Sequence, residues 1–180
     1  ELVIGHTRLY EGTGMKLNAI GLAQKMGQNG ALGITLMAVD FGDIPVTTTN
    51  APEGTGASFS PSFFNIGIAY SHTFEQKVSV GVLVRGVSES IADVNAFGLA
   101  IDAGVQYTTG QRDNFKFGVT LRNMGSPMKF SGQGLAFTTP NPDGGSYVLT
   151  VNQRPAGFEL PSMLNIGLSY DFYVGEHHRI

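Results

Sequence analysis

Residues 97–107 read Phe-Gly-Leu-Ala-Ile-Asp-Ala-Gly-Val-Gln-Tyr, in which large apolar residues alternate with small or polar ones. Successive side chains of a strand point to opposite faces, so the stretch predicts a β-strand with two unlike faces. The pattern returns at 115–122 and 164–172. Its non-apolar face is mostly Gly, Ala, Ser and Asn with isolated charges, rather than the long charged side chains of a soluble sandwich. Such strands are typical of a wall with lipid on one side and a crowded lumen on the other.

The composition agrees with a barrel wall. The 180 residues include 25 Gly and no Cys, only 14% are charged, and the net charge is -3. No apolar run reaches the roughly 18 to 20 residues of a membrane-spanning helix, so strands of about 9 to 11 residues would do any spanning. The mild acidity argues against a nucleic-acid partner. The chain opens at Glu1 without a leader-like segment, so we expect a mature form or a fragment.

Eight strands are expected, at 2–10, 15–26, 31–39, 63–72, 78–88, 96–108, 115–123 and 163–172. Short connections (27–30, 73–77, 109–114) alternate with long ones (40–62, 124–162), and 89–95 is intermediate but on the long side. This alternation places the tight turns at one end of an up-and-down sheet and the long loops at the other, external end.

The sequence therefore predicts an all-β fold, an antiparallel up-and-down transmembrane β-barrel, with 1–180 as a single barrel segment. Eight strands is the lower bound for closing a barrel, and such a barrel is filled by its own side chains. The many Gly and Ala residues on the inner face would leave it underfilled. We therefore expect the chain to be part of a larger barrel.

The charged residues to be explained within the strands all fall on the small-residue face: Arg85, Asp102, Lys116, Arg122 and Asp171. A lipid-facing Arg or Lys would cost about 2 to 4 kcal/mol at the membrane midplane. If the hairpin turns near Asp93, Arg85 lies close to opposite Asp102, which predicts a cross-strand ion pair. The pair is either structural and self-neutralising or part of a polar conduit for a substrate.

No motif supports catalysis. Ser126 and Lys129 match Ser-x-x-Lys but lie in a Gly- and Pro-punctuated loop rather than on a helix. The Gly-Thr-Gly at 54–56 lacks the third glycine and the helix of a phosphate-binding turn. His6 and His72 have no second ligand at metal spacing. We expect no enzyme activity, no catalytic residues, no cofactor and no metal.

Several motifs follow one another in a fixed order: Val-Thr-Thr-Thr-Asn-Ala-Pro-Glu-Gly-Thr-Gly at 46–56, Phe-Asn-Ile-Gly-Ile-Ala-Tyr at 64–70, Ser-Glu-Ser-Ile-Ala-Asp-Val at 88–94, Ala-Ile-Asp-Ala-Gly-Val-Gln-Tyr at 100–107, Leu-Arg-Asn-Met-Gly at 121–125, Leu-Pro at 160–161 and Ile-Gly-Leu-Ser-Tyr at 166–170. Over about 40–172 the chain thereby resembles the PorV/PorQ family of outer-membrane proteins. Members resemble the FadL-type barrel of about 14 strands, which implies that this chain lacks strands at both ends.

The resemblance also implies a place in the bacterial outer membrane and in the type IX secretion system. There a PorV-type barrel is an accessory or shuttle protein, which docks to the SprA-type translocon and binds secreted cargo through the cargo's C-terminal signal domain. The family supplies no catalytic residues. Two alternatives stay open: a FadL-type transporter of hydrophobic small molecules, and a soluble β-rich adhesive or structural protein.

The loops 40–62 and 124–162 are the expected sites of partner contact, because surface loops commonly carry binding residues. Their apolar candidates are Phe41, Ile44, Val46, Phe59, Phe130, Phe137 and Tyr147. The stretch 147–151 is a candidate extra strand in an external hairpin. Alternatively, these apolar residues fold over the barrel mouth as a lid or plug.

Overall fold

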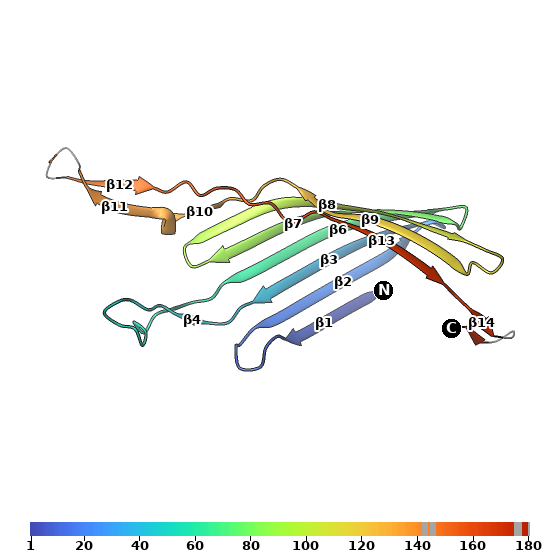
Figure 1. Ribbon diagram of the computed structural model, residues 1–180, viewed down its shortest axis with the longest axis horizontal. Helices are drawn as coiled ribbons and strands as arrows, with labels where there is room; N and C mark the ends of the chain where they lie inside the picture. The colour runs from blue at the N-terminus through green and yellow to red at the C-terminus, as the bar shows by residue number, and fades with distance from the viewer. Residues whose placement is uncertain (142–143, 145–146, 175–177, 180) are drawn as a thin grey trace.

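The computed structural model describes residues 1–141, 144, 147–174 and 178–179, so four positions of the expected loop 124–162 (142, 143, 145 and 146) lie outside the described residues. Its main element is an antiparallel sheet in which eight strands follow chain order (Figure 1). These strands are β1 (Leu2–Arg8), β2 (Lys16–Met26), β3 (Gly30–Asp40), β6 (Ser62–Phe74), β7 (Val78–Ile91), β8 (Val94–Thr109), β9 (Phe115–Gly125) and β13 (Met163–Tyr170). The prediction of an all-β, antiparallel, up-and-down sheet is confirmed.

Each of the eight expected strands is present, but one expected connection is wrong. The segment 89–95 was expected as a connection of intermediate length, whereas β7 runs to Ile91 and β8 begins at Val94. The hairpin between them turns through Ala92 and Asp93 alone, with Ala92 at φ +48°. Glu89, Ser90 and Ile91 thus belong to β7, which extends the strand toward the long-loop end.

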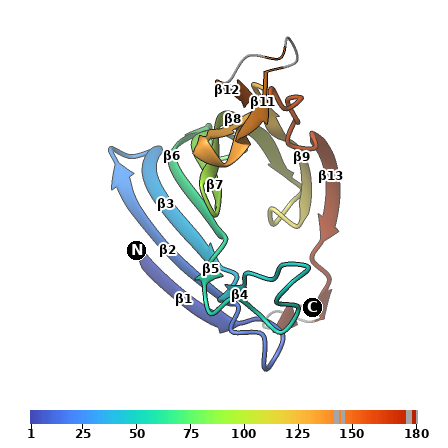
Figure 2. The same cartoon turned by 90° about the vertical axis from the view of Figure 1, so that its left-hand side faces the viewer.

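The sheet curves strongly and stays open. Figure 2 shows the strands bending round from β1 to β13 about a central space. Among the described residues β1 and β13 do not pair with each other, so they form two free edges. No helix in the described part of the chain is long and apolar enough to cross a membrane.

The two faces of the sheet differ as the alternation predicts. On β8, Ala96 and Ala100 are buried, whereas Phe97 is 63% and Leu99 is 53% exposed. The small-residue face is the concave one, because one hollow is lined by residues that six adjacent strands contribute: Gly21, Thr35, Asn65, Arg85, Asp102 and Arg122. The large apolar side chains therefore cover the convex face.

The long connections carry small elements at one end of the sheet. In 41–61, β4 (Ile44–Pro45) pairs with β5 (Ser58–Phe59). In 126–162, β10 (Phe130–Gly132) pairs with β8, η1 (Gln133–Leu135) follows, and β11 (Ala136–Pro140) pairs with β12 (Val148–Asn152). The expected extra strand near 147–151 is confirmed as β12, and the β11–β12 hairpin projects beyond the sheet (Figure 1). A last pair, β14 (Tyr173–Val174) with β15 (His178–Arg179), follows β13.

The base of the second long connection turns inward rather than outward. Met128 and Phe158 exchange backbone hydrogen bonds, with N to O distances of 2.7 and 2.9 Å. Met128 packs with Val87 and Ala96 of the concave wall in a small buried cluster, and four partly buried side chains surround it: Phe63, Phe130, Phe158 and Leu160. This cluster is the main apolar core of the described chain, which is otherwise a single layer.

Candidate functional site

A β-bulge interrupts the pairing of β8 with β9 and creates the most elaborate polar site. Ile101 pairs with Met124 and Ala103 with Leu121, so Arg122 and Asn123 together oppose Asp102. Asn123 has φ +59°, a backbone conformation that Asn accepts more readily than most residues. Bulges bend a strand and redirect side chains, and this one brings the backbone of Asn123 to the carboxylate of Asp102.

The Asp102 carboxylate is the centre of a hydrogen-bonded network. Arg85 Nη2 donates to Asp102 Oδ1 at 2.8 Å, and the backbone N–H of Asn123 donates to the same oxygen at 2.8 Å. Arg85 Nη2 also donates to Asn123 Oδ1. The side chains of Arg85 and Asp102 are only 11% and 13% exposed, so the ion pair is largely withdrawn from solvent.

The ion pair joins residues that are close to, but not directly, opposite each other. Arg85 stands opposite Ala100, and Asp102 stands opposite Leu83. The ion pair therefore runs diagonally across β7 and β8, a separation that the long arginine side chain can span. The predicted cross-strand ion pair between Arg85 and Asp102 is confirmed, with Asp102 two residues along β8 from the position directly opposite Arg85.

Asn123 extends the network to the end of the long loop. Its side-chain Nδ2 donates to the carbonyl of Pro161 at 2.9 Å, and Ser162 Oγ donates to the carbonyl of Asn123 at 3.2 Å. The C-terminal end of the 126–162 connection is thus held at Asn123, close to where the connection leaves β9. Sequence reasoning missed Asn123 because its parity places it on the apolar face, and only the bulge turns it to the network.

The remaining predicted charges form a looser arrangement. Arg122 Nε lies 3.9 Å from Asp102 Oδ2, and the Arg122 side chain is half exposed. Lys116 Nζ lies 3.3 Å from Asp171 Oδ2. The structure therefore gathers Arg85, Asp102 and Arg122 into one cluster and pairs Lys116 with Asp171 in another.

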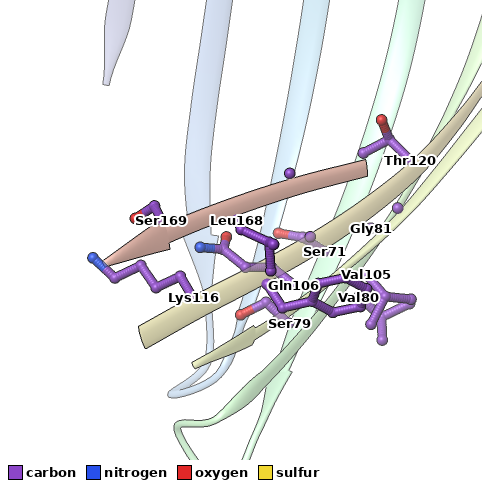
Figure 3. Close-up of a pocket in the computed structure, with 14 residues that line it drawn as sticks. Ser71, Ser79, Val80, Gly81, Val105, Gln106, Lys116, Thr120, Leu168 and Ser169 are labelled. Atoms are coloured by element: carbon purple, nitrogen blue, oxygen red, sulfur yellow. The ribbon is translucent and has the colours of Figure 1, made fainter. Parts of the chain in front are cut away.

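Nearer the short turns the concave wall is hollowed, and several polar residues of this face gather there. A hollow of about 480 Å³ is lined by hydroxyl, amide and ammonium groups, by glycines and by four apolar residues, Val80, Val105, Phe117 and Leu168 (Figure 3). Its polar residues are Ser71, Ser79, Gln106, Lys116, Thr120 and Ser169. The glycines keep this space open because they carry no side chain.

No protein-family model, curated protein or solved structure matches the chain. Its function is therefore inferred from the geometry and from the sequence pattern. In the described part of the chain, no three His, Cys, Asp or Glu side chains gather as metal ligands would. The polar network can hold strands together, but it contains no pairing of a nucleophile with a base.

The loop residues expected to contact partners divide into two groups. Phe41, Ile44, Phe137 and Tyr147 are exposed, and Val46 and Phe59 are half-buried, all at the long-loop end. Phe130 is placed differently: its ring stacks on that of Phe158, with centroids 5.4 Å apart, beside the buried Met128 cluster. Phe130 therefore fits the alternative of a loop that folds inward, and it does not belong to the projecting set.

Proposed function

We propose that this chain forms part of the wall of an outer-membrane β-barrel of the PorV/PorQ type. In this proposal the barrel is an accessory or shuttle protein of the type IX secretion system, which docks to a SprA-type translocon and binds secreted cargo. The observation that carries the membrane part is the exposed apolar convex face. The resemblance and the projecting loops support the secretion part.

The convex face presents apolar side chains in register across the sheet. One row crosses five adjacent strands, from Leu22 to Ile34, Ile68, Val84 and Ile101. These five side chains are 43% to 59% exposed. A soluble β-protein buries such a row under a second layer, and the described residues place no second layer over it. We infer that lipid chains cover this apolar face.

The strand lengths and the charges agree with a membrane wall. β2 and β3 have 11 residues each, and at about 3.3 Å per residue such strands can cross a hydrocarbon core of about 30 Å when tilted. The charges of the site lie in the concave clusters rather than on the convex face. The curvature and the two free edges support membership of a larger barrel, on the pattern of about 14 strands, because unpaired edges are not tolerated in lipid.

The projecting elements support a role in protein contact. The β11–β12 hairpin extends beyond the sheet and exposes Phe137, Tyr147, Val148 and Val151. Exposed apolar side chains on a hairpin offer anchors and a free strand edge to a protein partner. A docking protein needs such a surface but does not need catalytic residues.

The membrane part is tested by replacing Ile68, near the middle of β6, with arginine. If Ile68 faces lipid, Ile68→Arg should destabilise the protein by about 2 to 4 kcal/mol in vesicles. If the face meets water, a substitution at this 59% exposed position should change stability by less than about 0.5 kcal/mol. Phe137→Arg is the matched control, because Phe137 is similarly exposed but lies on the projecting hairpin. Equal effects of the two variants would contradict the membrane assignment.

The secretion part is tested by mild-detergent purification of the tagged full-length protein from outer membranes, followed by mass spectrometry. Recovery of a very large barrel protein, or of cargo proteins that share a C-terminal domain, is the expected result. Recovery of the protein alone with bound fatty acid would instead support a transporter.

A further inference from the structure

The concave wall changes character from one end of the sheet to the other. Toward the short turns it carries the hydroxyl and amide groups of the 480 Å³ hollow, among them Ser71 and Gln106 (Figure 3). Toward the long loops the same wall becomes apolar, with Phe63, Val87 and Ala96. The Arg85–Asp102 network lies between these two regions. The polar groups near the short turns can be hydrated by water. The apolar side chains near the long loops are stable only when other apolar groups cover them.

The chain supplies that cover itself. We define the plug segment as residues 126–130 together with 157–161, the two stems of the long connection. Met128, at its centre, is 0% exposed and packs on Val87 and Ala96. A Cβ on Gly98 would come within 2.5 Å of Met128 Cγ, so the wall is hollowed at the point where Met128 sits. The absence of a side chain at Gly98 therefore makes room for Met128, and this fit holds the plug segment against the concave face.

Both stems of the plug segment are fastened to the wall. The first stem leaves β9 beside the bulge, where Ser126 N donates to the carbonyl of Leu99 on β8. It then returns to the sheet as β10, which pairs with the start of β8. The second stem is held by the paired backbone bonds of Met128 and Phe158 and by the bond from Asn123 to Pro161. These contacts make an inward position the resting arrangement of the segment.

We propose that the barrel encloses a blind vestibule: an aqueous space that opens at the short-turn end and is closed at the long-loop end by the plug segment. The inference rests on the proposed membrane barrel and goes beyond its docking role. It assigns a barrier function to the loop stems and leaves the strands β11 and β12 for contact with partners. The barrel then contacts proteins at the surface without letting small solutes leak through the membrane.

The experiment uses single cysteines, because the chain has none of its own. Full-length variants Ser71→Cys, Met128→Cys and Tyr147→Cys are treated in intact cells with a charged fluorescent maleimide too large for general porins, and then again after the outer membrane is permeabilised. Tyr147→Cys should react in intact cells. Ser71→Cys should react only after permeabilisation, and Met128→Cys should react at least tenfold more slowly than Tyr147→Cys in both conditions.

Two results would overturn the vestibule. One is labelling of Ser71→Cys in intact cells at the rate of Tyr147→Cys, and the other is fast labelling of Met128→Cys. Because a substitution at Met128 can itself loosen the segment, the unmodified full-length protein is also measured in planar bilayers, where sustained ion conductance would contradict the plug. Fractionation of the same cells separates a failure of the vestibule from a failure of the proposed membrane barrel. Recovery of the protein outside the membrane fraction would refute the barrel itself.

Discussion

Replacement of Asp102 by asparagine should destabilise the protein strongly, because it leaves a buried cation without its counter-charge. The asparagine can still accept the hydrogen bond from the Asn123 backbone, so the main change is the loss of charge beside Arg85. Arg85 is only 11% exposed and cannot regain full hydration without moving. Removal of one partner from a buried ion pair costs about 3 to 5 kcal/mol.

We expect the lower end of this range, about 3 kcal/mol, because the cluster borders a hollow of the concave face. This loss corresponds to a change of about 150-fold in the unfolding equilibrium. Equilibrium unfolding in lipid vesicles, followed by far-UV circular dichroism, measures it directly. Asp171→Asn is the matched control: the Asp171 side chain is 15% exposed, but the cation that it would leave behind, Lys116, is 30% exposed and keeps part of its hydration. The loss should therefore be smaller, about 1 kcal/mol.

A double variant separates the charge effect from general disruption. Arg85→Met combined with Asp102→Asn removes the stranded cation and should be less destabilised than Asp102→Asn alone. The reasoning fails if Asp102→Asn unfolds within about 0.5 kcal/mol of the wild type, or if the double variant is less stable than the single one.

Three further changes probe other parts of the molecule. Gly98→Val should crowd the space beside Gly98 that Met128 occupies and lower the free energy of unfolding in vesicles by about 1 to 3 kcal/mol. Adding Met128→Ala should recover part of that loss. No recovery would mean that Met128 does not fill this space. Ala92→Asn should stabilise the β7–β8 hairpin by about 0.5 to 1 kcal/mol, since asparagine tolerates φ +48° better than alanine, and lower stability would contradict the turn geometry. Tyr147→Asp should leave unfolding unchanged but reduce the recovered partner severalfold in the detergent pull-down, and undiminished recovery would remove Tyr147 from the docking surface.

The strands and their two faces could be read from the sequence because a period of two directly encodes which side chains share a face. That pattern located all eight strands and put Arg85 and Asp102 on one side. It could not reveal the bulge at Asn123, because a single extra residue in one strand changes the parity after it without leaving a mark in composition.

The errors at the long-loop end have related causes. Glu89 and Ser90 look like the start of a connection because they are polar, yet their backbone continues the ladder to Ile91. Phe130 looks like an external anchor because it lies in a loop, yet the wall beside it is hollow at Gly98 and holds Met128. Whether a loop residue turns inward depends on such space in a distant strand, which local sequence does not show.

The chain order of the strands bears on how such a wall is made. Each of the eight main strands pairs with the main strand before it, and only the short β10 pairs back onto β8. Neighbours in sequence find each other quickly, so the wall can grow one hairpin at a time. The outer edges of β1 and β13 leave backbone donors and acceptors unpaired in the described part of the chain. If the sheet lies in a membrane as proposed, each group left unpaired in hydrocarbon would cost several kcal/mol. Its edges would then have to stay in water, or be covered by an assembly machinery, until both are paired.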